Sequence, residues 1–293
     1  MTTLAERLEG TLVPAVPVPF RGAVMEAAAQ RTYAEWMARQ PVAGVAVWAH
    51  TGRGPHLSGT VRREVLDTWR AAMPDRIVIA GARDIGMAIE ARRGKADALL
   101  AFPAREDPVG YHTRLSRELP VIAFYLYEAA GGVSYDDSTL HAILELPDVI
   151  GIKVATLDSV MTFQRIAAVL RSHPSKLLIT GEDRFLGYSL LLGARAALIG
   201  MGAALPDVQA DLLRARAQED WPRFIMLSEI CDRFAQATFI DPMEGYIRRM
   251  LWAAAADGAL PAVACDDPWG PALPNVERDA VERLVRDARA TRA

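Results

Sequence analysis

One lysine in this chain stands where an amine could do chemistry, at the end of an apolar segment typical of a β-strand. The 293 residues include 33 Lys and Arg side chains, of which only Lys95, Lys153 and Lys176 are lysine. Arginine keeps its proton in proteins, whereas a partly desolvated lysine can have a lowered pKa and act as a nucleophile. Lys153 follows the apolar run Val149–Ile152 and is the first candidate for covalent chemistry. The competing interpretation is a lysine whose charged end reaches solvent from a strand end.

A reactive lysine indicates a particular kind of reaction. A neutral amine attacks a ketone to form a Schiff base, and the protonated imine accepts electrons when a neighbouring carbon–carbon or carbon–oxygen bond breaks. Such a site also needs a proton carrier, an anchor for the acidic end of the substrate and shielding from water. Tyr125 lies in the apolar segment before that of Lys153, and the Thr51-Gly52 turn has backbone amides that can hold a carboxylate.

Eight short apolar segments alternate with longer amphipathic segments to about residue 200. The apolar segments are hydrophobic on both faces, as parallel strands buried beneath helices should be. This alternation predicts an α/β fold, the (β/α)8 TIM barrel, followed here by a C-terminal helical extension. The predicted strands are residues 11–18, 42–49, 76–80, 97–102, 120–126, 149–153, 176–180 and 196–200.

The predicted barrel covers residues 1–205. Residues 206–293 hold the last barrel helix and a C-terminal helical extension that we expect to pack on the barrel as part of a single structural unit. In such barrels chemistry takes place at the carboxyl ends of the strands, so Lys153 lies at the reactive end, whereas Lys95 and Lys176 lie at strand starts. The first helix is predicted over residues 23–40, and those of the extension over 224–238, 244–257 and 276–290.

Composition excludes several other classes of protein. The formal charge is −3 and the basic residues are scattered, so we expect no nucleic-acid partner. Cys231 and Cys265 lack the spacing of metal ligands, which predicts reduced thiols in a cytoplasmic protein with neither a metal nor another cofactor. No apolar run reaches the length that spans a membrane.

With these segments identified, the chain resembles the dihydrodipicolinate synthase and N-acetylneuraminate lyase superfamily of class I aldolases, over nearly its whole length. The most specific match is Gly151-Ile152-Lys153-Val154-Ala155-Thr156, which is similar to the family's G-I-K-x-[AS]-[TS] segment. The resemblance implies that Lys153 forms the Schiff base. It also implies that the tyrosine 28 positions upstream, Tyr125, exchanges protons with the substrate.

Other matches concern substrate binding. His50-Thr51-Gly52 occupies the place of the family's carboxylate-binding turn, and Gly181-Glu182-Asp183 resembles its G-[DN]-[DE] segment. Gly200 belongs to a region similar to the glycine-rich eighth strand that lines the family's pocket. The predicted catalytic residues are therefore Lys153 and Tyr125, and the predicted substrate-binding residues are Thr51, His50, Gly52, Gly181 and Gly200.

Departures from the family pattern bear on the substrate. His50 replaces a hydroxyl residue, Pro103-Ala104-Arg105 lacks the relay tyrosine, and the loop 128–132 lacks the carboxylate-binding arginine. These changes disfavour the condensation reaction of lysine biosynthesis and favour another 2-oxo acid. His50 itself could be a general base, could take the place of the lost hydroxyl in a relay, or could point into a neighbouring helix.

The sequence thus predicts a Schiff-base lyase of the aldolase type that acts on a small 2-oxo acid such as pyruvate or a 2-keto-3-deoxy acid. Dehydration of a 2-keto-3-deoxy sugar acid is an alternative, because the same imine serves both reactions. A barrel that has lost catalysis and binds a metabolite is a second alternative. The resemblance also implies a homo-oligomer, a dimer or a tetramer.

Overall fold

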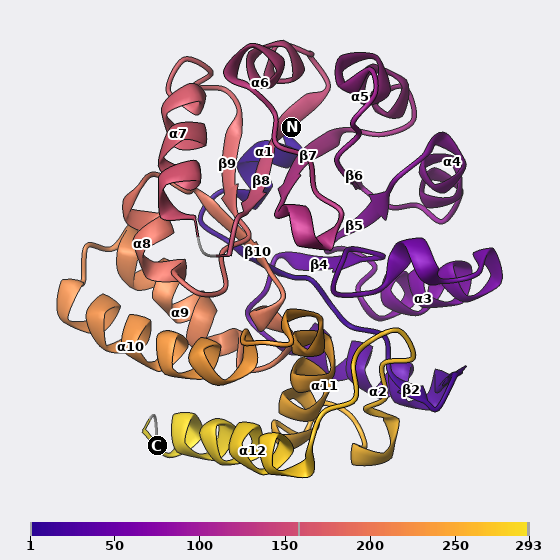
Figure 1. Ribbon diagram of the computed structural model, residues 1–293, viewed down its shortest axis with the longest axis vertical. Coiled ribbons are helices and arrows are strands. Elements are labelled where there is room, and N and C mark those ends of the chain that lie inside the picture. The colour runs from indigo at the N-terminus through magenta and orange to yellow at the C-terminus, as the bar shows by residue number, and fades with distance from the viewer. Residues whose placement is uncertain (1, 158, 292–293) are drawn as a thin grey trace.

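Eight parallel strands form one sheet that closes on itself in the computed structural model, which describes residues 2–157 and 159–291 (Figure 1). The sheet order is β1-β10-β9-β8-β7-β6-β5-β4, and a bridge between Ala15 and Ala46 joins its two edges. The predicted TIM barrel is therefore confirmed. The strands are β1 (Leu12–Pro14), β4 (Gly44–Val47), β5 (Ile77–Ala82), β6 (Ala98–Ala101), β7 (Val121–Leu126), β8 (Val149–Ala155), β9 (Leu177–Thr180) and β10 (Ala196–Ile199).

A ring of helices covers the outside of the barrel, and each follows a strand. Side chains alternate along the strands, so that one set fills the barrel interior and the other packs under the helices. Fully burying one large aliphatic side chain contributes about 1.5–3 kcal/mol, and both layers are rich in such residues. The helices are α2 (Ala27–Ala38), α3 (Gly59–Ala72), α4 (Ile85–Arg93), α5 (Pro108–Ser116), α6 (Asp137–Leu144), α7 (Val160–Leu170), α8 (Leu186–Leu191) and α9 (Pro206–Ala217).

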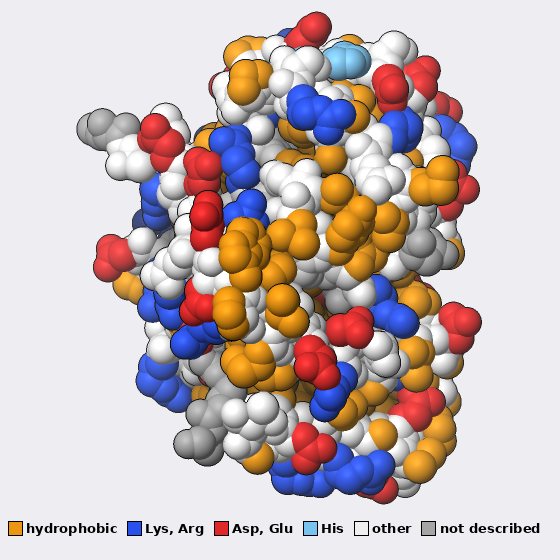
Figure 2. Space-filling model, turned by 90° about the vertical axis from the view of Figure 1, so that its left-hand side faces the viewer, with side chains coloured by type: hydrophobic (Ala, Val, Ile, Leu, Met, Phe, Trp, Pro, Cys, Tyr) orange, Lys and Arg blue, Asp and Glu red, His pale blue; other side chains and the backbone are white. Residues whose placement is uncertain are grey.

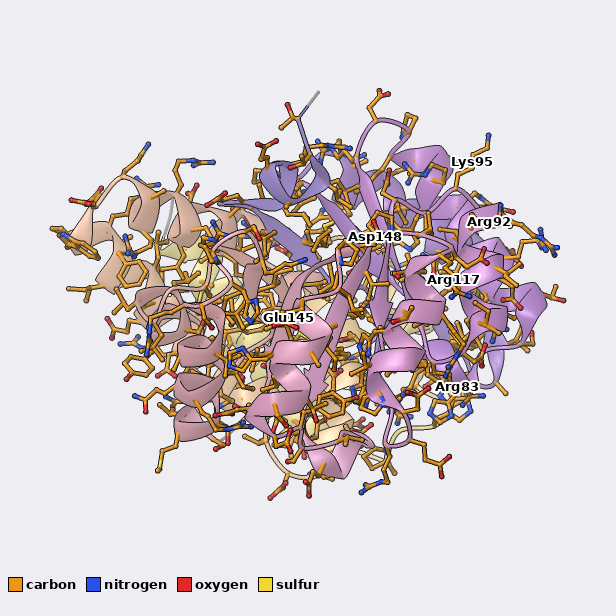
Figure 3. The ribbon with its side chains drawn as sticks, turned by 90° about the horizontal axis from the view of Figure 1, so that it is seen from above. Arg83, Arg92, Lys95, Arg117, Glu145 and Asp148 are labelled. Carbon is orange, nitrogen blue, oxygen red and sulfur yellow. The ribbon has the colours of Figure 1, made fainter. Side chains whose placement is uncertain are left out.

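The two ends of the barrel are chemically different. Figure 3 shows Lys95 and Asp148 at one side of the molecule, beside the strand starts, and Arg83 at the other side, just after β5. The short helix α1 (Leu4–Leu8) packs Leu8 against the interior core. Lys176 lies at the start of β9, where its Nζ donates to the carbonyls of Leu146 (2.8 Å) and Val149 (2.7 Å). Its structural role agrees with the expectation that chemistry lies at the opposite end.

The first predicted helix begins later than expected. Phe20–Arg21 (β2) and Val24–Met25 (β3) pair as an antiparallel hairpin, so the helix predicted from residue 23 begins at Ala27. Gly22 makes the turn with a φ of 58°, a left-handed conformation that glycine adopts at little cost. Periodicity alone missed this turn because the residues after it continue the apolar pattern of the helix.

The C-terminal region returns to the mouth of the barrel. Helix α10 (Trp221–Thr238) packs on α8 and α9, and α11 (Tyr246–Ala256) packs on α12 (Asn275–Ala290). In Figure 1 the chain between α10 and α11 passes close to the barrel strands before α12 runs along the lower edge. The segment that precedes α11 is thereby placed next to the carboxyl ends of the strands.

A buried arginine fixes this return segment. The Arg249 side chain is fully buried, and its Nε donates to Glu277 of α12 at 2.7 Å. Its Nη1 donates to the carbonyl of Ile240 at 2.7 Å, and further contacts join it to carbonyls of residues 238, 241 and 242. One charged side chain therefore ties α11 to α12 and to the segment beside the barrel mouth. We propose on this basis that residues 206–293 unfold together with the barrel.

Arg249→Met tests this proposal. The substitution leaves Glu277 and several carbonyls without their buried donor, which typically destabilises a protein by about 3–5 kcal/mol. We expect one cooperative denaturant transition, monitored by circular dichroism and tryptophan fluorescence, with a lower midpoint. The matched control Arg233→Met removes only an exposed ion pair with Glu229 and should change the stability by less than about 0.5 kcal/mol. Two separate transitions in the natural protein would contradict a single unit.

Candidate active site

Lys153 lies within β8, and its side chain points into the mouth of the barrel. Its neighbours across the sheet are Phe124 of β7 and Ile179 of β9. The side chain is buried, and Nζ lies 4.3 Å from the centre of the Phe124 ring. A small cavity surrounds the amine, lined by His50, Thr51, Phe124, Leu126, Tyr127, Lys153, Ala155, Leu157, Gly181, Asp183, Gly200, Phe239 and Tyr246.

Burial changes the acidity of this amine. Removal from water lowers the pKa of Lys153 to about 8, because the apolar surroundings disfavour the charged form. The carboxyl groups of Asp183 and Glu182 oppose this shift by their negative charge. Asp183 is held in place by the amide of Met201, which donates to its Oδ1 at 2.7 Å. Near neutral pH a useful fraction of Lys153 is therefore unprotonated and able to attack a carbonyl.

Two of the predicted glycines make room for the reactive groups. A Cβ at Gly181 would lie 2.5 Å from Cε of Lys153, so any larger residue would displace the lysine side chain. A Cβ at Gly200 would lie 3.1 Å from Oγ1 of Thr51 and 3.2 Å from Cε2 of Tyr246. The structure thus brings both glycines to the cavity of Lys153.

The predicted carboxylate turn lies at the same end of the barrel. Thr51 and Gly52 are buried in the turn after β4, and within residues 2–157 and 159–291 no acceptor binds either backbone amide. The left-handed conformations of Trp48 (φ 56°) and Arg53 (φ 51°) flank this turn. Non-glycine residues adopt such conformations at a cost, and they are found more often at functional sites than elsewhere.

The structure does not bring Tyr125, the predicted proton carrier, to the cavity of Lys153. Val121 pairs with Val149 but Ile122 pairs with Gly151, so Ile150 has no partner and the count along β8 shifts by one residue. Phe124 is therefore opposite Lys153, and Tyr125 faces outward into the layer beneath the helices. Its hydroxyl donates to Ser134 at 3.2 Å. The residues around Lys153 in the cavity lining include two other phenols, those of Tyr127 and Tyr246.

His50 points into the site and joins a hydrogen-bond network. Its Nδ1 lies 2.9 Å from the hydroxyl of Tyr246, which also lies 3.0 Å from Oγ1 of Thr51. Its Nε2 lies 3.3 Å from Oε1 of Glu244. His50 therefore borders the cavity of Lys153, while its partner Tyr246 is the first residue of the neighbouring helix α11.

Glu244 is the centre of charge in this network. Burial alone would raise its pKa, but hydrogen bonds from His50 and Arg53, the positive charge of Arg53, and that of His50 when its imidazole is protonated, outweigh that effect and lower the pKa to about 2. Arg53 contacts Glu244 at 2.6 Å and Asp267 at 2.7 Å, and the Tyr127 hydroxyl donates to Glu244 at 3.1 Å. The carboxylate of Glu244 therefore stays ionised and is held from three sides.

Sequence reasoning missed Glu244, Tyr246 and Asp267. Glu244 and Tyr246 lie at the start of a predicted helix, and Asp267 lies in a proline-rich loop, so neither pattern nor motif linked them to Lys153. Glu182 has a supporting role that the motif did not reveal, since its carboxylate accepts from the amides of Thr156 (2.6 Å) and Leu157 (2.9 Å). It fixes the loop that follows the lysine strand.

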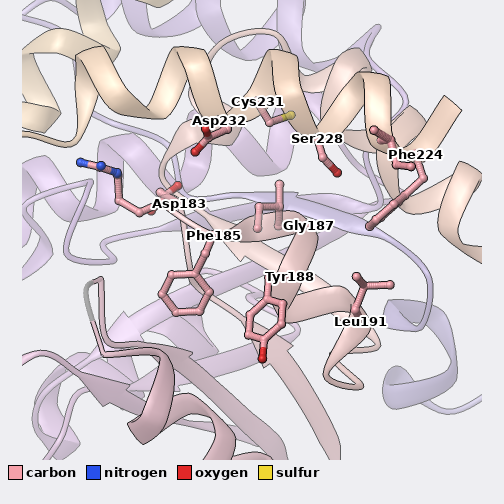
Figure 4. Close-up of a pocket in the computed structure, with 12 residues that line it drawn as sticks. Asp183, Phe185, Gly187, Tyr188, Leu191, Phe224, Ser228, Cys231 and Asp232 are labelled. Carbon is pink, nitrogen blue, oxygen red and sulfur yellow. The ribbon is translucent and has the colours of Figure 1, made fainter. Parts of the chain in front are cut away.

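A separate pocket lies outside the barrel, between α8 and α10. Figure 4 shows Phe224 and Ser228 of α10 next to Gly187 of α8, with Tyr188 and Leu191 further along. Asp183 borders both this pocket and the lysine cavity, but Lys153 lines only the latter. The apolar outer pocket lacks the amine and the polar network, so it is not a candidate reaction site.

The surface near this pocket bears on oligomerisation. Figure 2 shows an apolar area on the face covered by α7, α8 and α10. The most exposed of its side chains are Met161 (81%), Ile225 (65%) and Leu191 (49%). The expected dimer or tetramer stays a prediction.

Two further searches of the described part of the chain concern membrane-spanning helices and metal-binding groups. None of its helices combines the length and the apolar character that crossing a membrane requires. Over the same residues, no group of three His, Cys, Asp or Glu side chains is arranged so that it could hold a metal ion.

Comparison with known proteins finds similar sequences and similar structures. No protein-family model matches the chain. The 4-hydroxy-tetrahydrodipicolinate synthase of Protochlamydia amoebophila is 24% identical over 241 residues, which cover 78% of this chain and 79% of that protein. The N-acetylneuraminate lyase of Mycoplasma synoviae superimposes with a TM-score of 0.79 at 17% identity, over 97% of this chain and 98% of the lyase.

Two further solved structures share the fold. A prophage protein of the dihydrodipicolinic acid synthase family from E. coli K12, in complex with pyruvate, gives a TM-score of 0.85 at 17% identity, over 95% of this chain and 98% of its own. A catalytic lysine mutant of the Ruminococcus gnavus sialic acid aldolase gives 0.85 at 17% identity over 99% of both chains. Together these likenesses show that the chain has the barrel fold of the N-acetylneuraminate lyases and dihydrodipicolinate synthases and is similar in sequence to a 4-hydroxy-tetrahydrodipicolinate synthase, and they indicate a lyase.

Proposed function

We propose that this lyase forms a Schiff base between Lys153 and the keto carbon of a small 2-oxo acid, and cleaves or forms the bond next to it. The observation that carries the proposal is the buried amine of Lys153, whose pKa is lowered to about 8, at the reactive end of the barrel. A buried lysine with a depressed pKa is the activated form of this nucleophile. The pyruvate bound to the E. coli relative supports a 2-oxo acid as the substrate class.

The reaction begins with attack of Nζ on C2 of the 2-oxo acid. The carbinolamine that forms loses water, which gives a protonated imine. In the cleavage direction the hydroxyl on C4 loses a proton, the C3–C4 bond breaks and its electron pair moves toward the imine nitrogen. An aldehyde and an enamine result, and protonation of the enamine at C3 followed by hydrolysis releases pyruvate and restores Lys153. These steps balance in atoms and electrons without an oxidant or a reductant.

Substrate orientation follows from the turn after β4. The substrate carboxylate would lie on the unoccupied backbone amides of Thr51 and Gly52, with the Thr51 hydroxyl close by. Amide groups arranged in a turn bind anions well because their dipoles converge on one point. Gly181 and Gly200 leave the space in which C2 and C3 would lie.

Aldol chemistry is better supported than a barrel that only binds a metabolite. Metabolite binding alone would not require an unprotonated amine, yet the amine is buried where the loss of hydration disfavours its charge. Dehydration of a 2-keto-3-deoxy acid would use the same imine.

Borohydride trapping tests the proposed Schiff base. Incubation with pyruvate and sodium borohydride should add one carboxyethyl group to the intact protein, because the imine forms with loss of water and its reduction gives a stable secondary amine. The Lys153→Ala variant should gain no mass, whereas Lys176→Ala, which changes a lysine at the amino end of the barrel, should react like the natural protein. An adduct that persists in Lys153→Ala would place the chemistry elsewhere.

The rate of trapping should depend on pH in a characteristic way. The nucleophile is the neutral amine, so the rate should rise about tenfold per pH unit below a pKa near 8 and level off above it. A lysine with the ordinary pKa of 10.5 would continue to gain reactivity up to that pH.

Asp183→Asn is the companion variant for this measurement. It keeps an acceptor for the amide of Met201 but removes a charge that raises the pKa of Lys153. The midpoint of the profile should therefore move to lower pH. A midpoint that stays near the ordinary lysine value of 10.5 in the natural protein would show that burial does not activate Lys153.

A further inference from the structure

The lysine site lacks a phenol on the neighbouring strand, and another phenol reaches the cavity from a distant part of the chain. Phe124 lies opposite Lys153 and has no proton to exchange. Tyr246, the first residue of α11, borders the same cavity from the C-terminal region. We propose that Tyr246, His50 and Glu244 form a proton relay for the substrate bound to Lys153, an inference that rests on the proposed Schiff-base function.

The hydrogen-bond partners determine where the protons lie. Glu244 is ionised and can only accept, so Nε2 of His50 carries the hydrogen that points to it at 3.3 Å. In neutral imidazole the other nitrogen is then an acceptor, so Nδ1 receives the hydroxyl proton of Tyr246 at 2.9 Å. The arrangement of carboxylate, imidazole and hydroxyl is the one that activates nucleophiles in hydrolases, here with a phenol as the outer group.

Thr51 completes the hydrogen bonding of the phenol. Because Tyr246 donates to His50, the hydroxyl of Thr51 donates to the Tyr246 oxygen at 3.0 Å. One lone pair of that oxygen then remains for a substrate proton. The same threonine belongs to the proposed carboxylate turn, so binding of the substrate and orientation of the phenol are linked through one side chain.

Packing holds the relay rigidly. The Tyr246 ring stacks on Phe239 at 4.9 Å and on His50 at 5.9 Å between ring centres. The absence of a side chain at Gly200 leaves space for it. Behind Glu244, Arg53 joins that carboxylate to Asp267, which is buried. Arg53, which Asp267 holds from the other side, fixes the position of Glu244. It adds no second proton carrier.

The relay accounts for both proton transfers of the aldol reaction. In cleavage the C4 hydroxyl gives its proton to Tyr246 as the phenol proton passes to His50, and the C3–C4 electron pair moves into the iminium to form the enamine. The imidazolium that results lies beside the Glu244 carboxylate, so charge separation is small. The proton then returns through Tyr246 to C3 of the enamine, which leaves every group in its original state.

A purely structural network is the alternative explanation of these contacts. It would fix α11 to the barrel mouth and would contribute to stability without touching the substrate. The two explanations differ in what happens to proton exchange at C3 of pyruvate, because exchange requires the imine and also a group that removes the proton. This exchange can be measured without knowing the aldehyde product.

Exchange of the pyruvate methyl protons in deuterium oxide, followed by proton NMR, is therefore the test. We expect Tyr246→Phe to form the borohydride adduct normally and to exchange about 10²-fold more slowly than the natural protein, the typical contribution of a general acid–base. The matched control Tyr125→Phe removes a phenol that faces away from the cavity and should exchange at the natural rate. Normal exchange in Tyr246→Phe would overturn the relay while the Schiff-base proposal stands.

Two further variants separate proton transfer from packing. His50→Ala should lose exchange by a similar factor. Added imidazole should restore part of the exchange, because His50 also borders a second pocket, with Arg53, Glu244 and Trp269, from which imidazole can enter the space left by the side chain. Glu244→Gln should reduce exchange as well, since the amide cannot stabilise an imidazolium. Absence of rescue in a His50→Ala protein that still forms the adduct would contradict transfer through His50. Absence of any adduct in the natural protein would instead count against the Schiff-base function itself.

Discussion

The burial of one amine is the constraint on which the arrangement of the reactive end depends. An ammonium group loses hydration in the barrel mouth, and the Phe124 ring and the charges of Asp183 and Glu182 compensate only in part. The amine therefore gives up its proton more easily than a surface lysine would. Space around it is equally tight, since at position 181 only a glycine leaves Cε of the lysine in place. Reactivity and close packing are two consequences of the same burial.

The C-terminal region contributes side chains to the candidate site as well as to the fold. It contributes Phe239, Glu244 and Tyr246 to the barrel mouth, and the buried Arg249 holds the segment that contains the first two. A TIM barrel by itself presents only its own loops to a substrate. Here a helix that follows the barrel adds the phenol that β7 does not provide.

The sequence predicted the eight strands well because each is a continuous apolar run between turn residues, and the motif around Lys153 pointed to β8 as the strand of the candidate site. It failed at Tyr125 because one unpaired residue, Ile150, shifts by one position every pair that β7 and β8 form after it. A count along the chain cannot detect such a bulge. It failed at Glu244 and Tyr246 because contacts across about 200 positions leave no trace in local periodicity. Local patterns therefore identified the lysine, and only the tertiary structure identified the candidate for its proton carrier.

A crystal structure of the protein soaked with pyruvate tests the central claim most directly, since it shows the covalent bond and the relay together. Our account predicts continuous density between Nζ of Lys153 and C2 of pyruvate. It also predicts that the pyruvate carboxylate lies on the amides of Thr51 and Gly52, and that the Tyr246 hydroxyl lies close enough to C3 to transfer a proton. Pyruvate bound without a covalent bond, or an adduct from which Tyr246 points away, would contradict it.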